Sequence, residues 1–171
     1  MNVFITSGSF NFLKSKKDKH PNENILLMQN PDTTVLLHET EGKTIFSSPR
    51  KYEVVDGKGT LQDHGYVVMN NIPVSEEGRP VFEHRFKNRV GFIENEPGFV
   101  ALRVLRPINS ETYVILTIWE KQTDFLHWKK SSSFQKAHIS DSKAPVTNSS
   151  QKMFSGEPYV TLYTLVKDSE E

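Results

Sequence analysis

The order of strand-like and helix-like patterns from Tyr66 onward restricts the fold more than any other feature of the chain. Four β-prone runs occur with two helical patterns, one between the first and second runs and one between the third and fourth. The resulting order, β-α-β-β-α-β, is typical of a ferredoxin-like antiparallel sheet with two helices on one face. We therefore predict an α+β fold, with strand-like runs at residues 66–74, 99–105, 113–119 and 158–166.

The two helical patterns differ in their signals. In the first, Pro80 suits a first helical position, and Phe82, Phe86 and Val90 repeat at roughly helical spacing to form a core-facing stripe. The second follows Trp119, with Thr123 as the expected N-cap and Asp124 in its first turn. Three serines at 131–133 can close this helix and cap another.

The first 60 residues give a weaker version of the same order. A short strand, a basic helical segment, a hairpin and a final β-run follow one another, and 57–65 is predicted to be a linker. We expect residues 1–60 to be a degenerate copy of the complete domain at 66–167. The runs are Val3–Ile5, 10–19, 25–38, Thr44–Phe46 and Lys51–Val55, the last ending in a turn at Asp56-Gly57.

Composition excludes several classes of function. Basic and acidic residues each number 21, so the net charge of zero favours neither a nucleic-acid nor an anionic-membrane partner. The chain has no cysteine, which excludes disulfides, thiolate metal sites and cysteine nucleophiles. We expect a cytoplasmic protein, because the first residues lack the pattern of a signal peptide and no apolar run is long enough to span a membrane.

Three residues of the second half could carry chemistry. Asn70 interrupts an apolar strand with an amide that can donate and accept hydrogen bonds. Trp128 and His138 lie ten residues apart, and an aromatic ring beside an imidazole can form a pocket for a flat apolar ligand; a neutral imidazole is a common ligand of haem iron. The same residues are also compatible with structural roles: an edge-strand amide, a core tryptophan and a helix-end histidine.

Other catalytic motifs are missing from the sequence. His20 and His64 lie in expected loops and His38 at a strand end, whereas His84 and His127 lie on expected helices. No HExxH sequence, paired-histidine spacing, P-loop or Gly-x-Ser-x-Gly elbow occurs. Metal-dependent hydrolysis and serine nucleophilic chemistry therefore lack support.

The second half resembles the antibiotic biosynthesis monooxygenase (ABM) family and, within it, the IsdG-type haem-degrading monooxygenases. The resemblance covers about residues 66–167 and includes Asn-Asn-Ile-Pro-Val from Asn70 and Glu-Pro-Gly-Phe from Glu96. It also includes Phe-Glu-His-Arg-Phe-Lys-Asn-Arg from Phe82, the strand 113–119, and the segments 124–128 and 133–138. The family's functional Asn, Trp and His match Asn70, Trp128 and His138.

The resemblance implies a function and roles for these residues. It implies oxygen-dependent cleavage of haem, which is both substrate and cofactor, with release of iron and with electrons from an external reductase. His138 would be the axial ligand of the haem iron. Asn70 would act on oxygen at the distal side, and Trp128 would press on the macrocycle and distort it. Arg85 and Arg89 are candidates for propionate contacts, although a solvated helix face explains them equally well.

Short members of the family pair two copies into a barrel-like dimer. We accordingly expect this chain to be a monomer that imitates such a dimer, with its N-terminal sheet packed on the C-terminal one and a single haem site. Three alternatives remain at this point: a non-catalytic haem-binding or storage module, a cofactor-free ABM oxygenase of a polyaromatic substrate, and a structural or regulatory dimerisation domain.

Overall fold

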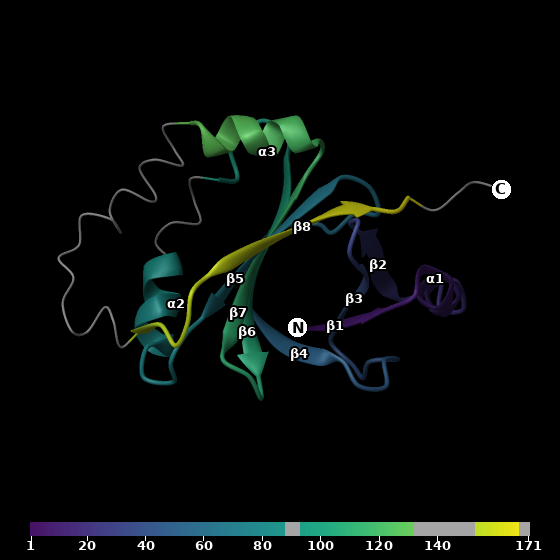
Figure 1. Cartoon of the computed structure of the whole chain (residues 1–171), viewed down its shortest axis with the longest axis horizontal. Coiled ribbons are helices and arrows are strands. Elements are labelled where there is room, and N and C mark those ends of the chain that lie inside the picture. Colours follow the sequence, from purple (N-terminus) through teal and green to yellow (C-terminus); the bar gives the residue numbers. More distant parts are fainter. Residues whose placement is uncertain (88–92, 132–152, 168–171) are drawn as a thin grey trace.

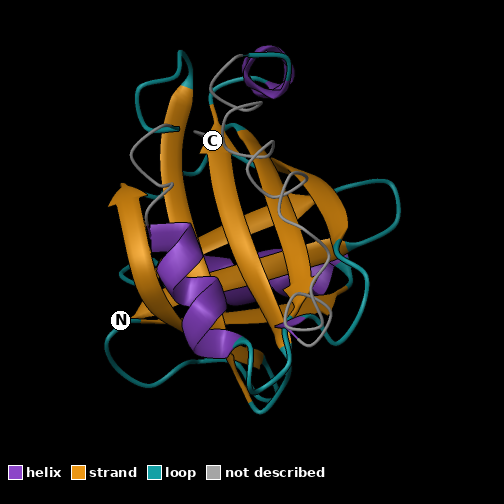
Figure 2. Ribbon diagram, turned by 90° about the vertical axis from the view of Figure 1, so that its left-hand side faces the viewer, coloured by secondary structure: helices purple, strands orange, loops and turns teal. Residues whose placement is uncertain are grey.

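A computed structural model of the chain describes residues 1–87, 93–131 and 153–167. Within these residues, eight strands close into one barrel in the order β1-β3-β2-β8-β5-β7-β6-β4, with every neighbouring pair antiparallel (Figure 2). Helix α1 lies on the far side of the barrel from α2 (Figure 1). No helix among the described residues is long and apolar enough to cross a membrane.

The C-terminal half has the predicted order of elements. It consists of β5 (Tyr66–Pro73), α2 (Arg79–Lys87), β6 (Phe99–Ile108), β7 (Thr112–Trp119), α3 (Gln122–Lys129) and β8 (Tyr159–Leu165). Its strands lie side by side in the order β8-β5-β7-β6, which is fourth, first, third and second along the chain. The ferredoxin-like α+β fold with an antiparallel sheet is thereby confirmed.

The N-terminal half repeats this strand order with one helix among its described elements. It consists of β1 (Asn2–Gly8), α1 (Phe10–Asp18), β2 (Asn24–Gln29), β3 (Thr34–Thr40) and β4 (Arg50–Gly59). These strands lie in the order β4-β1-β3-β2, again fourth, first, third and second. The matching order agrees with a degenerate second copy, and the division into units 1–60 and 66–167 stays a prediction.

Two seams join the halves, and they differ in length. Strands β4 and β6 pair over eight residue pairs, from Lys51 with Ile108 to Gly59 with Ala101. Strands β2 and β8 pair at only two positions, Met28 with Leu165 and Gln29 with Thr164. The barrel is therefore closed mainly by the β4–β6 seam.

Alternation along the strands separates an inner core from two outer layers. Along β5, Val67 and Met69 point into the barrel, whereas Val68 and Ile72 belong to the layer under α2 and α3. The other outer layer lies under α1 and contains Leu13. Each half thus buries one sheet face in a shared interior and packs helix against part of the other face.

Two predictions made for the first half were wrong. Strand β4 continues to Gly59 instead of ending at Asp56-Gly57, because it pairs with β6 through a bulge between Val54 and Asp56. Tertiary pairing here overrides the turn signal of Asp-Gly. Residues 44–46 form no strand: Thr44 accepts a hydrogen bond from the Phe46 backbone, and the Phe46 ring is buried in the layer under α1.

Candidate functional site

The outer face of the C-terminal sheet positions two of the three predicted site residues. Asn70 stands between Val68 and Ile72 on the outward-facing side of β5, and it is half-buried. In register with it lie Ile115 on β7 and Val160 on β8. The Asn70 amide therefore has apolar neighbours along its own strand and across both adjacent strands.

The two neighbouring amides of β5 have opposite surroundings. The Asn71 amide is buried and donates to the Met69 carbonyl at 3.1 Å, the Tyr159 carbonyl at 3.2 Å and the Thr161 hydroxyl at 3.1 Å. For the side chain of Asn70, the described part of the chain provides no hydrogen-bond partner. Asn71 is thus a structural residue, whereas the Asn70 amide has hydrogen-bonding capacity to spare.

Strand β8 adds apolar side chains that sequence reasoning missed. Val160 and Leu162 lie in register with Asn70 and Val68 and are 55% and 37% exposed. Since β-strand side chains alternate, both point to the same outer face as Asn70. We call Val68, Asn70, Val160 and Leu162 the β5–β8 strip. Alternation along the predicted strand 158–166 was the signal that could have identified its β8 members.

Trp128 belongs to the same outer layer, in the last turn of α3. It is half-buried, and its ring centroid lies 5.6 Å from Trp119 and 6.2 Å from Phe125. It packs against the apolar cluster that also contains Val68 and Ile72, the residues that flank Asn70. The structure therefore places Asn70 and Trp128 on one layer of the molecule.

The start of α3 differs by two residues from the prediction. The N-cap is Lys121, not Thr123, because the Asp124 carboxylate accepts a hydrogen bond from the Lys121 backbone N–H at 3.1 Å. Gly98, with φ of 80°, packs so close to Asp124 that an added Cβ would lie 2.2 Å from its carboxylate. The turn before β6 thus packs tightly against the first turn of α3.

The remaining predicted site residues lie either outside the described residues or at exposed positions on α2 and α3. His138 and Arg89 lie outside the described residues. Arg85, His84 and His127 are exposed on α2 and α3. Across residues 1–87, 93–131 and 153–167, no three His, Asp or Glu side chains are grouped so that they could hold a metal ion.

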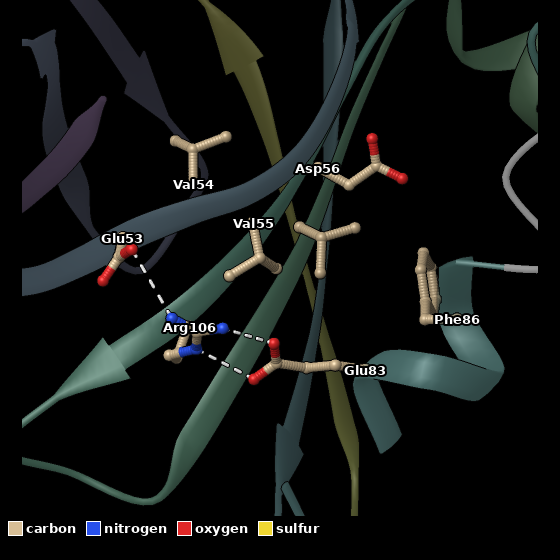
Figure 3. Close-up of a pocket in the computed structure, with 8 residues that line it drawn as sticks. Glu53, Val54, Val55, Asp56, Glu83, Phe86 and Arg106 are labelled. Atoms are coloured by element: carbon tan, nitrogen blue, oxygen red, sulfur yellow. Dashed lines mark hydrogen bonds and ion pairs between the residues drawn. The ribbon is translucent and has the colours of Figure 1, made fainter. Parts of the chain in front are cut away.

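A separate cavity of about 290 Å³ lies between α2 and strands β4 and β6 (Figure 3). Asn70 and Trp128 do not line it. At its wall Arg106 donates to both carboxylate oxygens of Glu83 and pairs with Glu53 at 3.5 Å. The cavity is lined by Glu53, Val54, Val55, Asp56, Glu83, Phe86, Val104 and Arg106.

The Glu83 carboxylate anchors α2 to the sheet. It accepts hydrogen bonds from Arg106 on β6 and from the Tyr113 hydroxyl on β7. The Arg106 hydrogen bond holds the pKa of Glu83 below its usual value, and burial raises the pKa of Tyr113 well above its usual value. The network therefore holds α2 against β6 and β7.

Comparison with known proteins finds a family match within the C-terminal half. Residues 65–139 match the family model described as antibiotic biosynthesis monooxygenase. The chain is 26% identical over 129 residues to a "Heme-degrading monooxygenase" of Listeria monocytogenes, covering 75% of this chain and 77% of the relative. It is 27% identical over 141 residues to "Signal transduction protein TRAP" of Staphylococcus epidermidis, covering 82% and 84%.

The fold is shared over nearly the whole chain. A solved structure described as a major regulator of staphylococcal pathogenesis superposes with a TM-score of 0.84 at 24% identity, covering 98% of this chain and all of the other. The extra N-terminal half is therefore part of a known architecture. The stretch that matches the ABM model lies within the observed β-α-β-β-α-β half-barrel, and the similarity to the solved structure shows the fold of both halves.

Proposed function

We propose that this protein is a haem-degrading monooxygenase, which cleaves haem with oxygen and releases its iron. The observation that carries the proposal is the Asn70 amide, half-buried in the apolar β5–β8 strip and without a hydrogen-bond partner among the described residues. The similarity to a relative named for haem degradation supports it.

The side chains of this layer, together with His138, suit the proposed substrate. The exposed Val160 and Leu162 offer an apolar surface for one face of a flat macrocycle, and Trp128 adds an aromatic ring in the same layer. For the iron we propose His138, because a neutral imidazole is a common ligand of haem iron. When bound, haem supplies the oxygen-activating iron.

Each residue would have a separate task. The Asn70 amide would donate a hydrogen bond to oxygen at the distal side, and it would not itself bind the iron. Trp128 would press its ring against the substrate plane and favour a distorted macrocycle. His138 would hold the substrate in place. Arg85 and Arg89 are proposed contacts for the propionates.

Electrons must come from outside the chain, because the sequence contains no flavin or nicotinamide fingerprint. We propose an electron-donating reductase as the partner and the cytoplasm as the place of action. A strong chemical reductant can replace that partner in a test of turnover.

The test is a hemin titration followed by reduction under air. We expect a Soret band at one haem per chain, its decay after a reductant is added, and released iron captured by a ferrous chelator. His138→Ala should lose most of the binding. The exposed His84→Ala and His127→Ala are matched controls that should bind normally. Normal binding by His138→Ala would exclude it as the ligand, and a Soret band that persists in the wild type would exclude degradation.

A second candidate is a regulatory module without turnover. It is favoured by the similarity to the protein named for signal transduction, which extends over 82% of this chain. Stable haem binding without decay of the Soret band would support a haem-binding form of this module. Oxygen uptake with a polyaromatic substrate and no haem would instead indicate a cofactor-free oxygenase.

A further inference from the structure

The two tryptophans of the chain are neighbours. Trp119 ends β7 and is fully buried, whereas Trp128 lies in the last turn of α3 and is half-buried. Their ring centroids are 5.6 Å apart and their planes differ by 32°. The half-buried tryptophan thus packs against a fully buried one.

Trp119 itself is held from three sides. Its indole N–H donates to the Thr117 hydroxyl at 3.1 Å. Phe99 meets the ring edge-on, with centroids 5.9 Å apart and an interplanar angle of 82°. Phe125 lies 6.1 Å from Trp119 and 6.2 Å from Trp128, so it contacts both indoles. A large buried ring with a bonded N–H has little freedom to turn.

We propose that Trp119 is a positioning residue, which sets the plane of Trp128 for the reaction on the substrate. The inference rests on the proposed function for its catalytic consequence. Trp128 stands near the end of a short helix, where packing on one ring face selects its rotamer. Because Trp119 is the nearer of the two rings that pack on it, the other being Phe125, loss of the Trp119 indole leaves Trp128 present but turned away from the productive angle.

The geometry predicts that loss of the Trp119 indole changes the rate of haem degradation but not the affinity for hemin. Trp119 has no exposed surface, so it does not touch the substrate and its removal should leave hemin affinity within about threefold. The rate of haem degradation should fall about tenfold, because ring orientation matters only in the reacting complex. A general loss of folding would instead weaken binding and rate together.

The first experiment measures the pair without haem. Two indoles at this distance couple, and since the chain has no other tryptophan, a far-ultraviolet circular dichroism couplet reports on this pair alone. The wild type should show the couplet, and Trp119→Phe and Trp128→Phe should each lose it. Thr117→Val keeps the shape of the core but releases the Trp119 N–H, and it should reduce the couplet.

The second experiment measures degradation in the same variants and in the double variant Trp119→Phe/Trp128→Phe. If Trp119 acts through Trp128, the double variant should be no slower than Trp128→Phe alone. Phe82→Leu is the matched control: it removes a buried ring of the same layer that contacts Phe86 and Tyr113, and it should keep both couplet and rate.

The outcomes distinguish the two proposals. A wild type without the couplet, a wild-type rate in Trp119→Phe, or additive losses in the double variant would overturn the positioning role. If Trp119→Phe does not fold, Thr117→Val decides by the same couplet and rate. A wild type that shows the couplet but leaves haem intact would overturn the proposed function, and with it the catalytic task of the pair.

Discussion

Arg103 of β6 and Glu39 of β3 form an ion pair with a 2.7 Å contact between the guanidinium Nε and a carboxylate oxygen. Their side chains are only 11% and 8% exposed, and Arg103 also donates to the carbonyls of Lys58 and Leu102. The pair joins one strand of each half, so it ties the N-terminal and C-terminal sheets together independently of the two seams.

Removal of one partner of this pair should destabilise the whole barrel. Arg103→Met leaves the Glu39 carboxylate buried without its counter-ion, and we expect a loss of about 3 kcal/mol in the free energy of unfolding. The double variant Glu39→Leu/Arg103→Met should recover much of the loss, because it leaves no buried charge. Urea unfolding measures both. A loss below about 1 kcal/mol in Arg103→Met would show that water screens the pair.

The adjacent amides of β5 should respond in opposite ways to truncation. Asn70→Ala should unfold like the wild type and bind haem, but it should degrade haem slowly. Asn71→Ala removes a buried amide that donates to three oxygens, so it should cost about 1–3 kcal/mol of stability. Thermal melts and single-turnover rates of both variants provide the measurement. Normal turnover by Asn70→Ala would refute its proposed role.

Glu83 should make the protein acid-sensitive. Its pKa is lowered in the folded state, chiefly by the Arg106 hydrogen bond, so its contribution to stability is present above the ordinary value of 4.5. That contribution is lost as the pH falls from 4.5 through the lowered folded value. Glu83→Gln should therefore be less stable than the wild type at pH 7, and the difference should shrink in acid. Glu53→Gln, which removes the exposed partner of Arg106, should change little.

Gly98 should be intolerant of a side chain. Its positive φ disfavours L-residues by about 1–2 kcal/mol, and a Cβ would collide with the Asp124 carboxylate. Gly98→Ala should lower the melting temperature and displace the start of α3. Gly42→Ala is the control, since the nearest atom to its added Cβ would be the Thr40 hydroxyl at 3.8 Å. Equal melting temperatures for the two variants would contradict this reasoning.

The C-terminal half should not be stable as a monomer. A fragment of residues 66–171 would expose the inward-facing Val67, Met69 and Leu116, which belong to the shared interior, and the β6 edge that pairs with β4. We expect the fragment to self-associate, while the full chain sediments as a monomer with one haem site. A stable monomeric fragment, or a full-length obligate dimer, would remove the basis for the monomer prediction.

The C-terminal fold could be predicted because its strands are continuous apolar runs, such as Tyr113 to Trp119. Helical patterns at two places between these runs indicated the order of the elements. The end of β4 could not, because Gly57, Lys58 and Gly59 form strand only by pairing with β6. The outward position of Asn70 follows from alternation in β5, but its spare hydrogen-bonding capacity depends on its neighbours in space. The exposed side chains of β8 likewise become a surface only beside β5.

The unequal seams have an evolutionary consequence. In a dimer of identical chains, each substitution at one seam occurs also at the other, so both must keep the same strength. A single chain with two half-barrels is released from that constraint, and here eight residue pairs hold one joint while two hold the other. The weaker joint borders β8, the strand that carries Val160 and Leu162. Covalent linkage of the halves thus permits a short joint beside the β5–β8 strip while the longer joint keeps the barrel closed.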